Sequence, residues 1–135
     1  MSAWLRHDEP MRVYLPLLAS DLEALGAGRS LSLDARSAVA TTPEFAVTVE
    51  SDEPDELDLI AALAASDLSS GGAVAVLECD ALVVDAELGE VSVSGDFSLF
   101  DFECLLTADV ESQEVSWFGV QELTELRQAL GKTAG

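Results

Sequence analysis

The segment 50–58 holds the densest group of side chains that could bind a cation. These side chains are the carboxylates of Asp and Glu, whose oxygen atoms bind Ca²⁺ or Mg²⁺. An EF-hand loop beginning at Asp52 would need Gly and Glu where Leu57 and Leu63 stand. The favoured interpretation of the segment is therefore a solvated helix N-terminus. The alternatives are an irregular divalent-cation site and an acidic surface that binds a basic partner. The candidate carboxylates are Glu50, Asp52, Glu53, Asp55, Glu56 and Asp58.

Histidine and cysteine are too few for the common nucleophile and zinc sites. The only histidine, His7, lies in a polar stretch without a helix or strand pattern, so we expect it to be solvated. Cys79 and Cys104 lack the CxxC spacing of a zinc site. We expect both thiols to be buried and reduced, which favours the cytoplasm, with a single bridge between them as the alternative.

The common phosphate-binding motifs fail on spacing. Gly131-Lys132-Thr133 resembles the end of a P-loop, but Leu126 occupies the position that requires the first glycine. A dinucleotide-binding turn requires glycines, and the turn after the first expected strand contains none. The sequence therefore predicts no cofactor, and it favours a protein without enzymatic activity.

Other acidic and aromatic groups carry weaker signals. Carboxylates that stand close together could act as general acid and base, but the chain has 26 Asp and Glu, so chance neighbours are expected. These groups are Asp80, Asp85 and Glu87, and Asp101 and Glu103. We expect the aromatic residues to lie mostly in the core, with an apolar groove or a protein contact as alternatives. They are Phe97, Phe100, Phe102, Trp117 and Phe118.

The charge balance restricts the class of partner. The 135 residues include 6 Lys and Arg against 26 Asp and Glu, a net charge of −20. Residues 37–126 contain 21 acids and no Lys or Arg. Such a chain cannot offer a basic face to nucleic acid or to an anionic membrane, and its field attracts basic proteins.

Composition also predicts a folded chain. The apolar fraction is 49% and the mean hydropathy is +0.27, which is too apolar for a disordered acidic chain. We expect a tail at 1–10, one domain at 11–131 and a tail at 132–135, with Met11 as an alternative start. Neither a signal peptide nor a run of about 20 apolar residues is recognisable, so we expect a soluble cytoplasmic protein.

Three helices follow from the periodicity. A capping box at Ser20–Glu23 predicts a helix of about two turns that Gly26 and Gly28 end. Pro54 and its acidic neighbours begin a second helix, and a third spans 119–130 and stops at Gly131. The apolar face of the second helix is Leu57, Ile60, Ala61, Ala64 and Leu68. Segment 43–47 could be helix or strand, and the Thr42-Pro43 start slightly favours helix.

Strand patterns lie between these helices. Residues 11–16 alternate, with Val13 and Leu15 on one face and Arg12 and Tyr14 on the other. The apolar run 73–77 predicts a strand buried on both faces. Further strands are expected at 90–94 and 103–108, with short pieces at 81–85 and 115–117. Segment 29–34 reads as loop or strand, 35–41 as a weak strand, and Gly89 and Gly95-Asp96 as turns.

Three short motifs resemble a family of small actinobacterial proteins of unknown function. They are Met11–Pro16, Asp55-Glu56-Leu57 before an Ala-rich helix, and Trp117–Leu123. The resemblance covers about residues 11–130 and implies a cytoplasmic α/β domain with no assigned catalytic residues. Segment 43–50 departs from the helical pattern of that family, because Phe45, Val47 and Val49 alternate.

We therefore predict a single α+β domain with a mixed, mostly antiparallel sheet of about five strands and three helices. The favoured function is a cytoplasmic protein-interaction or regulatory domain with an acidic surface. The alternatives are a small-ligand or divalent-metal binding domain, which could be an enzyme that uses carboxylates alone, and a nucleic-acid mimic that occupies a basic protein. The sequence does not determine the oligomeric state.

Overall fold

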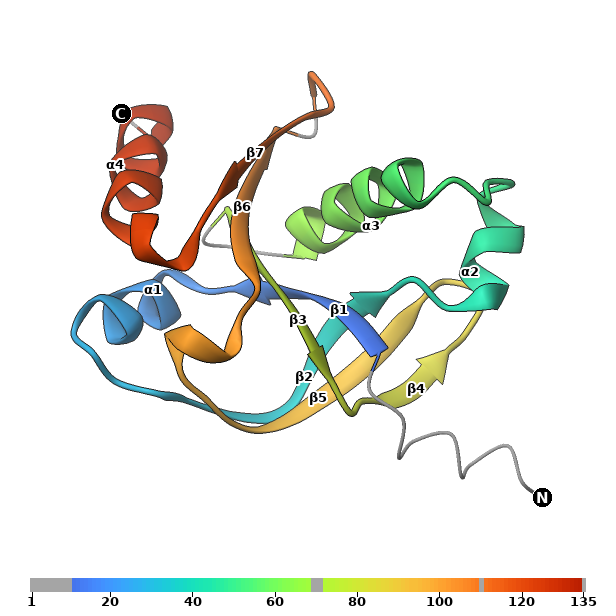
Figure 1. The fold of residues 1–135 in the computed structure, drawn as a ribbon, viewed down its shortest axis with the longest axis horizontal. Coiled ribbons are helices and arrows are strands. Elements are labelled where there is room, and N and C mark those ends of the chain that lie inside the picture. Colours follow the sequence, from blue (N-terminus) through green and yellow to red (C-terminus); the bar gives the residue numbers. More distant parts are fainter. Residues whose placement is uncertain (1–10, 69–71, 110, 135) are drawn as a thin grey trace.

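A computed structural model describes residues 11–68, 72–109 and 111–134, with the backbone alone for 131–134 (Figure 1). The strands are β1 (Met11–Leu17), β2 (Leu31–Ala40), β3 (Ala73–Cys79), β4 (Leu82–Asp85), β5 (Glu90–Phe97), β6 (Cys104–Asp109) and β7 (Glu114–Phe118). The helices are α1 (Ala19–Gly26), α2 (Pro43–Thr48), α3 (Pro54–Leu68) and α4 (Leu123–Ala134), with short 3₁₀ turns η2 (Leu99–Asp101) and η3 (Val120–Glu122).

The strands form one antiparallel sheet in the order β4-β5-β2-β1-β3-β6-β7. The α+β class is confirmed, but the predicted count of about five strands and three helices was wrong: the described chain has seven strands and four α-helices. β2 runs unbroken across the two weak segments, because a bulge between Leu33 and Arg36 keeps its pairing with β5. β5 continues to Phe97, past the turn predicted at Gly95.

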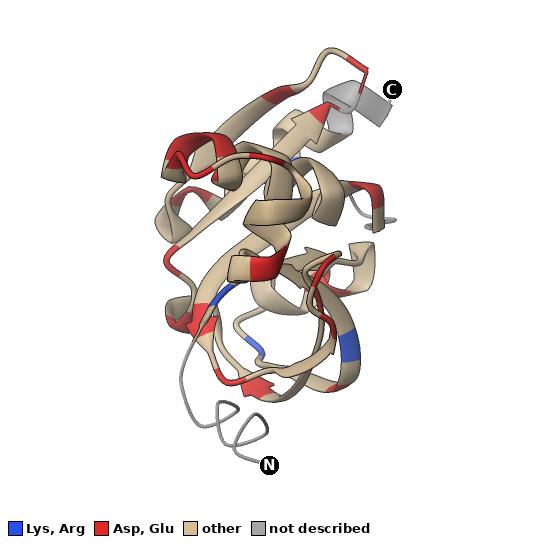
Figure 2. Ribbon diagram, turned by 90° about the vertical axis from the view of Figure 1, so that its right-hand side faces the viewer, with Lys and Arg blue, Asp and Glu red and all other residues tan. Residues whose placement is uncertain are grey.

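The sheet is curled into a ring at one side. Only Asp80 and Ala81 separate β3 from β4, yet the two strands lie four positions apart in the sheet. Four positions span about 19 Å in a flat sheet, whereas the chain from Cys79 to Leu82 reaches at most about 11 Å. β3 therefore continues into β4 and closes a ring with β1, β2 and β5, which Figure 2 shows end-on.

Apolar side chains fill both sides of this sheet. The ring encloses Val13, Leu15, Leu77, Val91 and Val93, and α1 and α4 add leucines to the same core. On the opposite face, α3 and α2 cover Tyr14, Val39, Val74, Val76 and Leu106. The faces predicted for Val13, Leu15 and Tyr14 in β1 are confirmed, although both faces are buried there, and the two-sided burial predicted for 73–77 is confirmed.

Helix α3 presents its alanines, more than its predicted apolar face, to the sheet. Ala61, Ala62 and Ala65 are fully buried, while Leu68 is 54% exposed. Leu57, Ile60 and Ala64 are only partly buried beside them. Small side chains allow the helix backbone to approach the sheet closely. The helix is therefore rotated about its axis, away from the orientation that the larger apolar residues predicted.

Helix ends differ from the predictions in three places. α1 begins two residues earlier than the Ser20 capping box implied, because the Asp21 carboxylate accepts a hydrogen bond from the Leu18 amide at 2.8 Å. α4 begins at Leu123, four residues after the predicted start at 119, because 120–122 form the 3₁₀ turn η3, and it continues past Gly131 to Ala134. The predicted helix at 43–47 is confirmed as α2, where the Thr42 hydroxyl accepts from the Phe45 amide at 3.0 Å.

Candidate functional site

The predicted acidic cluster follows the link from α2 into the first turns of α3. Glu50, Asp52, Glu53, Asp55 and Glu56 are all exposed. Asp55 and Glu56 occupy the first turn, where carboxylates favour the positive end of the helix dipole. Glu50 and Asp52 line an open hollow of about 440 Å³ with Val47. In the described part of the chain, no three His, Cys, Asp or Glu side chains are grouped to hold a metal ion.

Asp58, the sixth member of the cluster, turns inward to a polar network that the sequence did not predict. The Tyr14 hydroxyl donates to Asp58 Oδ1, and Arg12 Nε donates to the same carboxylate at 3.3 Å. Arg12 Nε also donates to the Tyr14 hydroxyl at 3.1 Å, and Arg12 Nη1 donates to Glu103 Oε2 at 2.6 Å. The network therefore joins β1, α3 and the residue just before β6.

Burial and charge fix the protonation states in this network. Burial, and then the hydrogen bond to Asp58, raises the pKa of Tyr14 above its ordinary value. Burial lowers the pKa of Arg12, but the Tyr14 hydrogen bond and the carboxylates of Asp58 and Glu103 raise it further, so the net shift is upward. A neutral phenol and a charged guanidinium are therefore held at neutral pH, which suits a structural clamp better than proton transfer.

A second ion pair fixes the other end of β1. Arg36 Nη1 donates to Asp21 Oδ2 at 2.8 Å and to the Pro16 carbonyl at 3.1 Å. Asp21 is 8% exposed and also caps α1. Both central arginines, Arg12 and Arg36, are thus neutralised by neighbouring acids.

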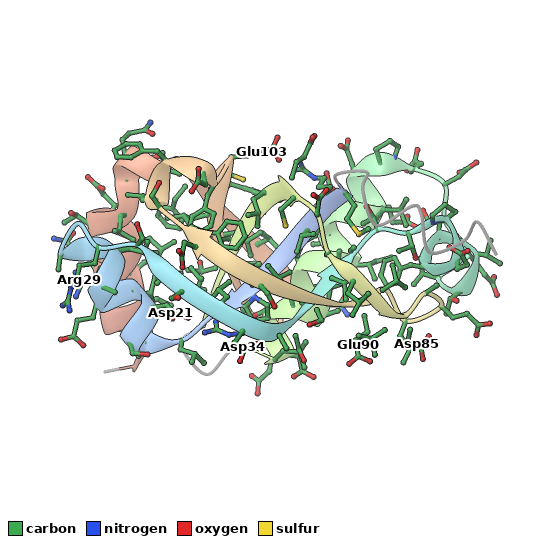
Figure 3. The ribbon with its side chains drawn as sticks, turned by 90° about the horizontal axis from the view of Figure 1, so that it is seen from below. Asp21, Arg29, Asp34, Asp85, Glu90 and Glu103 are labelled. Carbon is green, nitrogen blue, oxygen red and sulfur yellow. The ribbon has the colours of Figure 1, made fainter. Side chains whose placement is uncertain are left out.

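The remaining described arginines lie at one end of the molecule. Arg127 of α4 rests against Gly26 of α1, and Arg29 follows α1. Among described side chains, neither Arg29 nor Arg127 forms an ion pair. Figure 3 shows Arg29 at one extreme of the molecule and Asp85 and Glu90 towards the other.

Opposite these arginines lies a surface that we call the acidic end. It comprises α2, the link into α3 and the β4–β5 turn, which touch where the Thr42 hydroxyl donates to the Ala86 carbonyl at 2.7 Å. Figure 2 shows acidic residues on nearly every element and very few basic ones. The carboxylates of the acidic end are Glu44, Glu50, Asp52, Glu53, Asp55, Glu56, Asp85, Glu87 and Glu90.

Three of the five carboxylates considered for acid–base chemistry, Asp85, Asp101 and Glu103, have hydrogen-bond partners within the fold. Asp85 Oδ1 accepts from the amides of Glu87 and Leu88 at 3.1 and 3.2 Å. Asp101 Oδ2 accepts from the Ser98 amide at 2.7 Å, whereas Glu103 joins the Arg12 network. These carboxylates thus satisfy backbone donors and a guanidinium within the fold.

The thiols and aromatic residues divide between core and surface. Cys79 and Cys104 are both free and partly buried, and burial raises the pKa of each thiol. Phe102 is buried and Phe97 and Phe118 pack against the core, but Phe100 is 85% and Trp117 48% exposed. His7 lies outside the described residues, and 131–133 form part of α4.

A comparison with known protein families identifies the family of this chain. A model of a family of unknown function, DUF6912, matches residues 11–101. The chain belongs to this family. The DUF6912 match begins where β1 begins and contains the Met11–Pro16 and Asp55–Leu57 motifs, while Trp117–Leu123 lies beyond it. No curated protein and no solved structure matches the chain.

The family match covers both polar networks of the DUF6912 domain except for Glu103. It also covers the whole acidic end and the ring of strands, whereas β6, β7 and α4 follow the matched residues. In the described residues of this DUF6912 protein, no helix is long and apolar enough to span a membrane.

Proposed function

We propose that this DUF6912 protein is a protein-interaction domain that binds a basic partner through its acidic end. The observation that carries the proposal is that, among the described residues, no unpaired arginine lies at the acidic end. Arg12 and Arg36 are paired within the fold, and the exposed Arg29 and Arg127 lie at the α1–α4 end. The acidic end therefore presents uncompensated carboxylates, which attract a basic surface over several ångströms.

The polar networks support this proposal because they leave little for catalysis. Every buried side-chain nitrogen or oxygen in the described residues has a hydrogen-bond partner. The nucleic-acid mimic is less well supported, because it needs carboxylates in one row, whereas the exposed acids come from nearly every element (Figure 2). The two free thiols support a cytoplasmic location.

Binding to short fluorescent peptides tests the proposal. We expect a lysine-rich peptide to bind, a glutamate-rich peptide of equal length not to bind, and the affinity to fall as NaCl is added. The triple variant Glu50→Gln/Glu53→Gln/Glu56→Gln should weaken lysine-peptide binding by about tenfold. Absence of binding by the lysine peptide would refute the proposal.

A second triple variant separates the acidic end from net charge alone. Glu111→Gln/Glu114→Gln/Glu125→Gln removes the same charge from exposed positions on the β6–β7 hairpin and α4. We expect it to weaken binding by less than about threefold. Equal losses in the two triple variants would show that the acidic end is not the binding surface.

A further inference from the structure

Strand β4 combines an open edge with exposed aliphatic side chains. Leu82 is 54% and Val84 58% exposed, and Leu88 in the following turn is 61% exposed. In the described chain β4 pairs on one side only, with β5. An edge of this kind offers unpaired backbone donors and acceptors to an added strand.

A hollow lies on the outward face of the sheet, where Leu82 of β4 stands beside β5 and the β2 bulge. It measures about 340 Å³ and is lined by Asp80, Leu82, Ser92, Ser94, Ala35 and Ala81. Ala35 adopts a left-handed conformation, with φ of 53°, in the β2 bulge, and its amide donates to the Ser94 hydroxyl at 2.8 Å. One carboxylate, two hydroxyls and aliphatic walls suit an ammonium group at the end of a methylene chain, as in lysine.

The surrounding charges decide which occupant fits. Asp80, Asp85 and Glu87 flank β4. A second copy of the chain would bring these carboxylates against their equivalents, which costs free energy. A basic segment would neutralise them instead.

We propose that the open edge of β4 accepts an extended, lysine-bearing segment of the basic partner as an added strand. Aliphatic side chains of that segment lie against Leu82 and Val84, and a lysine on the same face of the added strand reaches past Leu82 into the hollow beside Asp80. Backbone pairing supplies the alignment, because side chains at alternate positions of the added strand face the same side of the sheet. The inference rests on the proposed function and specifies its binding surface.

Peptides of defined pattern test this inference on the full chain. The first probe is Lys-Ser-Val-Ser-Lys-Ser-Val-Ser-Lys, which places its lysines and valines on one face of a strand, and the second replaces each valine by serine at the same charge. A third probe is the valine peptide with methyl groups on alternate amide nitrogens, which removes backbone donors. We expect the valine peptide to bind about tenfold tighter than either of the other two.

Two surface substitutions locate the binding. Leu82→Ser and Asp80→Asn should each weaken valine-peptide binding by about fivefold to tenfold. Leu68→Ser and Asp67→Asn are matched controls at the end of α3, because Leu68 is also 54% exposed and Asp67 is also exposed. The controls should bind as the wild type does. Amide chemical-shift changes in the wild type should be concentrated at 80–85 and 92–94.

The outcomes separate this inference from the proposed function. Equal binding of the valine, serine and methylated peptides would overturn strand addition at β4, and the broader proposal would stand if the acidic-end triple variant still lost affinity. Unchanged binding by both Leu82→Ser and Asp80→Asn would equally overturn the β4 site. If no lysine peptide binds at all, both proposals fail.

Discussion

The Tyr14 hydroxyl donates a hydrogen bond to Asp58, which joins β1 to α3 across 44 positions of the chain. Tyr14 is completely buried, so its hydroxyl has no access to water in place of this partner. Arg12 binds both groups and also reaches Glu103. One buried phenol thus helps to fix the helix that carries part of the acidic end.

Removal of this contact should destabilise the protein measurably. We expect Tyr14→Phe to lower the free energy of unfolding by about 1 kcal/mol, and Asp58→Ala by about 2 kcal/mol, because the second leaves a buried hydroxyl without its acceptor. Urea denaturation followed by circular dichroism measures both. Asp67→Asn, an exposed acid on the same helix, should change stability by less than about 0.5 kcal/mol. A double mutant whose loss equals the sum of the single losses would show that the two side chains do not interact.

The N-terminal cap of α1 gives a second prediction. Asp21→Ala removes the acceptor for the Leu18 amide and the partner of Arg36, so we expect a loss of about 2 kcal/mol in unfolding free energy. Glu23→Ala, which would break the capping box expected from sequence, lies at an exposed position and should cost less than about 0.5 kcal/mol. Thermal or urea unfolding of the two variants compares them directly. A larger loss for Glu23→Ala would contradict the observed cap.

The buried thiol of Cys79 and the buried phenol of Tyr14 predict a loss of stability in alkaline solution. Burial, aided by the nearby charge of Asp80, raises the pKa of Cys79 to about 11, and burial raises the pKa of Tyr14 as well. Because the folded state holds these protons more tightly, their contribution is complete below the unfolded pKa values of about 9 and 10. It is lost as the pH rises through the folded values. We expect wild-type stability to fall from about pH 9 upward, and Cys79→Ser to reduce the slope between about pH 9 and 11.

The same shift makes the Cys79 thiol unreactive near neutral pH. A pKa raised from 9.0 to about 11 leaves roughly 100-fold less thiolate at pH 8. Alkylation of a Cys104→Ser variant by iodoacetamide, followed by mass spectrometry, should therefore be far slower than that of a free cysteine. Reaction at the rate of a free cysteine would contradict the burial of this thiol.

Salt should stabilise the protein, because its net charge is −20. Added NaCl screens the repulsion among exposed carboxylates, so we expect the melting temperature to rise by about 2–5 °C between about 10 mM and 0.5 M. Differential scanning fluorimetry suffices for this measurement. MgCl₂ or CaCl₂ at matched ionic strength should give the same rise; an additional increase would indicate a specific divalent-cation site.

The local patterns of the sequence predicted the elements that depend on near neighbours. Alternation at 11–16 predicts that Val13 and Leu15 share one face of β1 and Tyr14 the other, and the apolar run at 73–77 predicts burial on both faces of β3, because side chains in a strand alternate with a period of two. Thr42-Pro43 predicts the start of α2, because the cap involves residues only three positions apart. The charge balance, and the 90-residue interval without Lys or Arg, require no structure at all.

The tertiary structure decided what depends on distant pairs. The ring exists because β3 continues into β4 and reaches β5, and no local pattern encodes that partner. Asp58 looked like its acidic neighbours in the sequence, but packing of α3 on β1 turned it towards Tyr14 and Arg12. The sequence by itself determined that this protein is acidic, apolar enough to fold and built from strands and helices. Only the fold decided which charges are neutralised inside it and which remain outside, because pairing energy depends on distances that long-range packing sets.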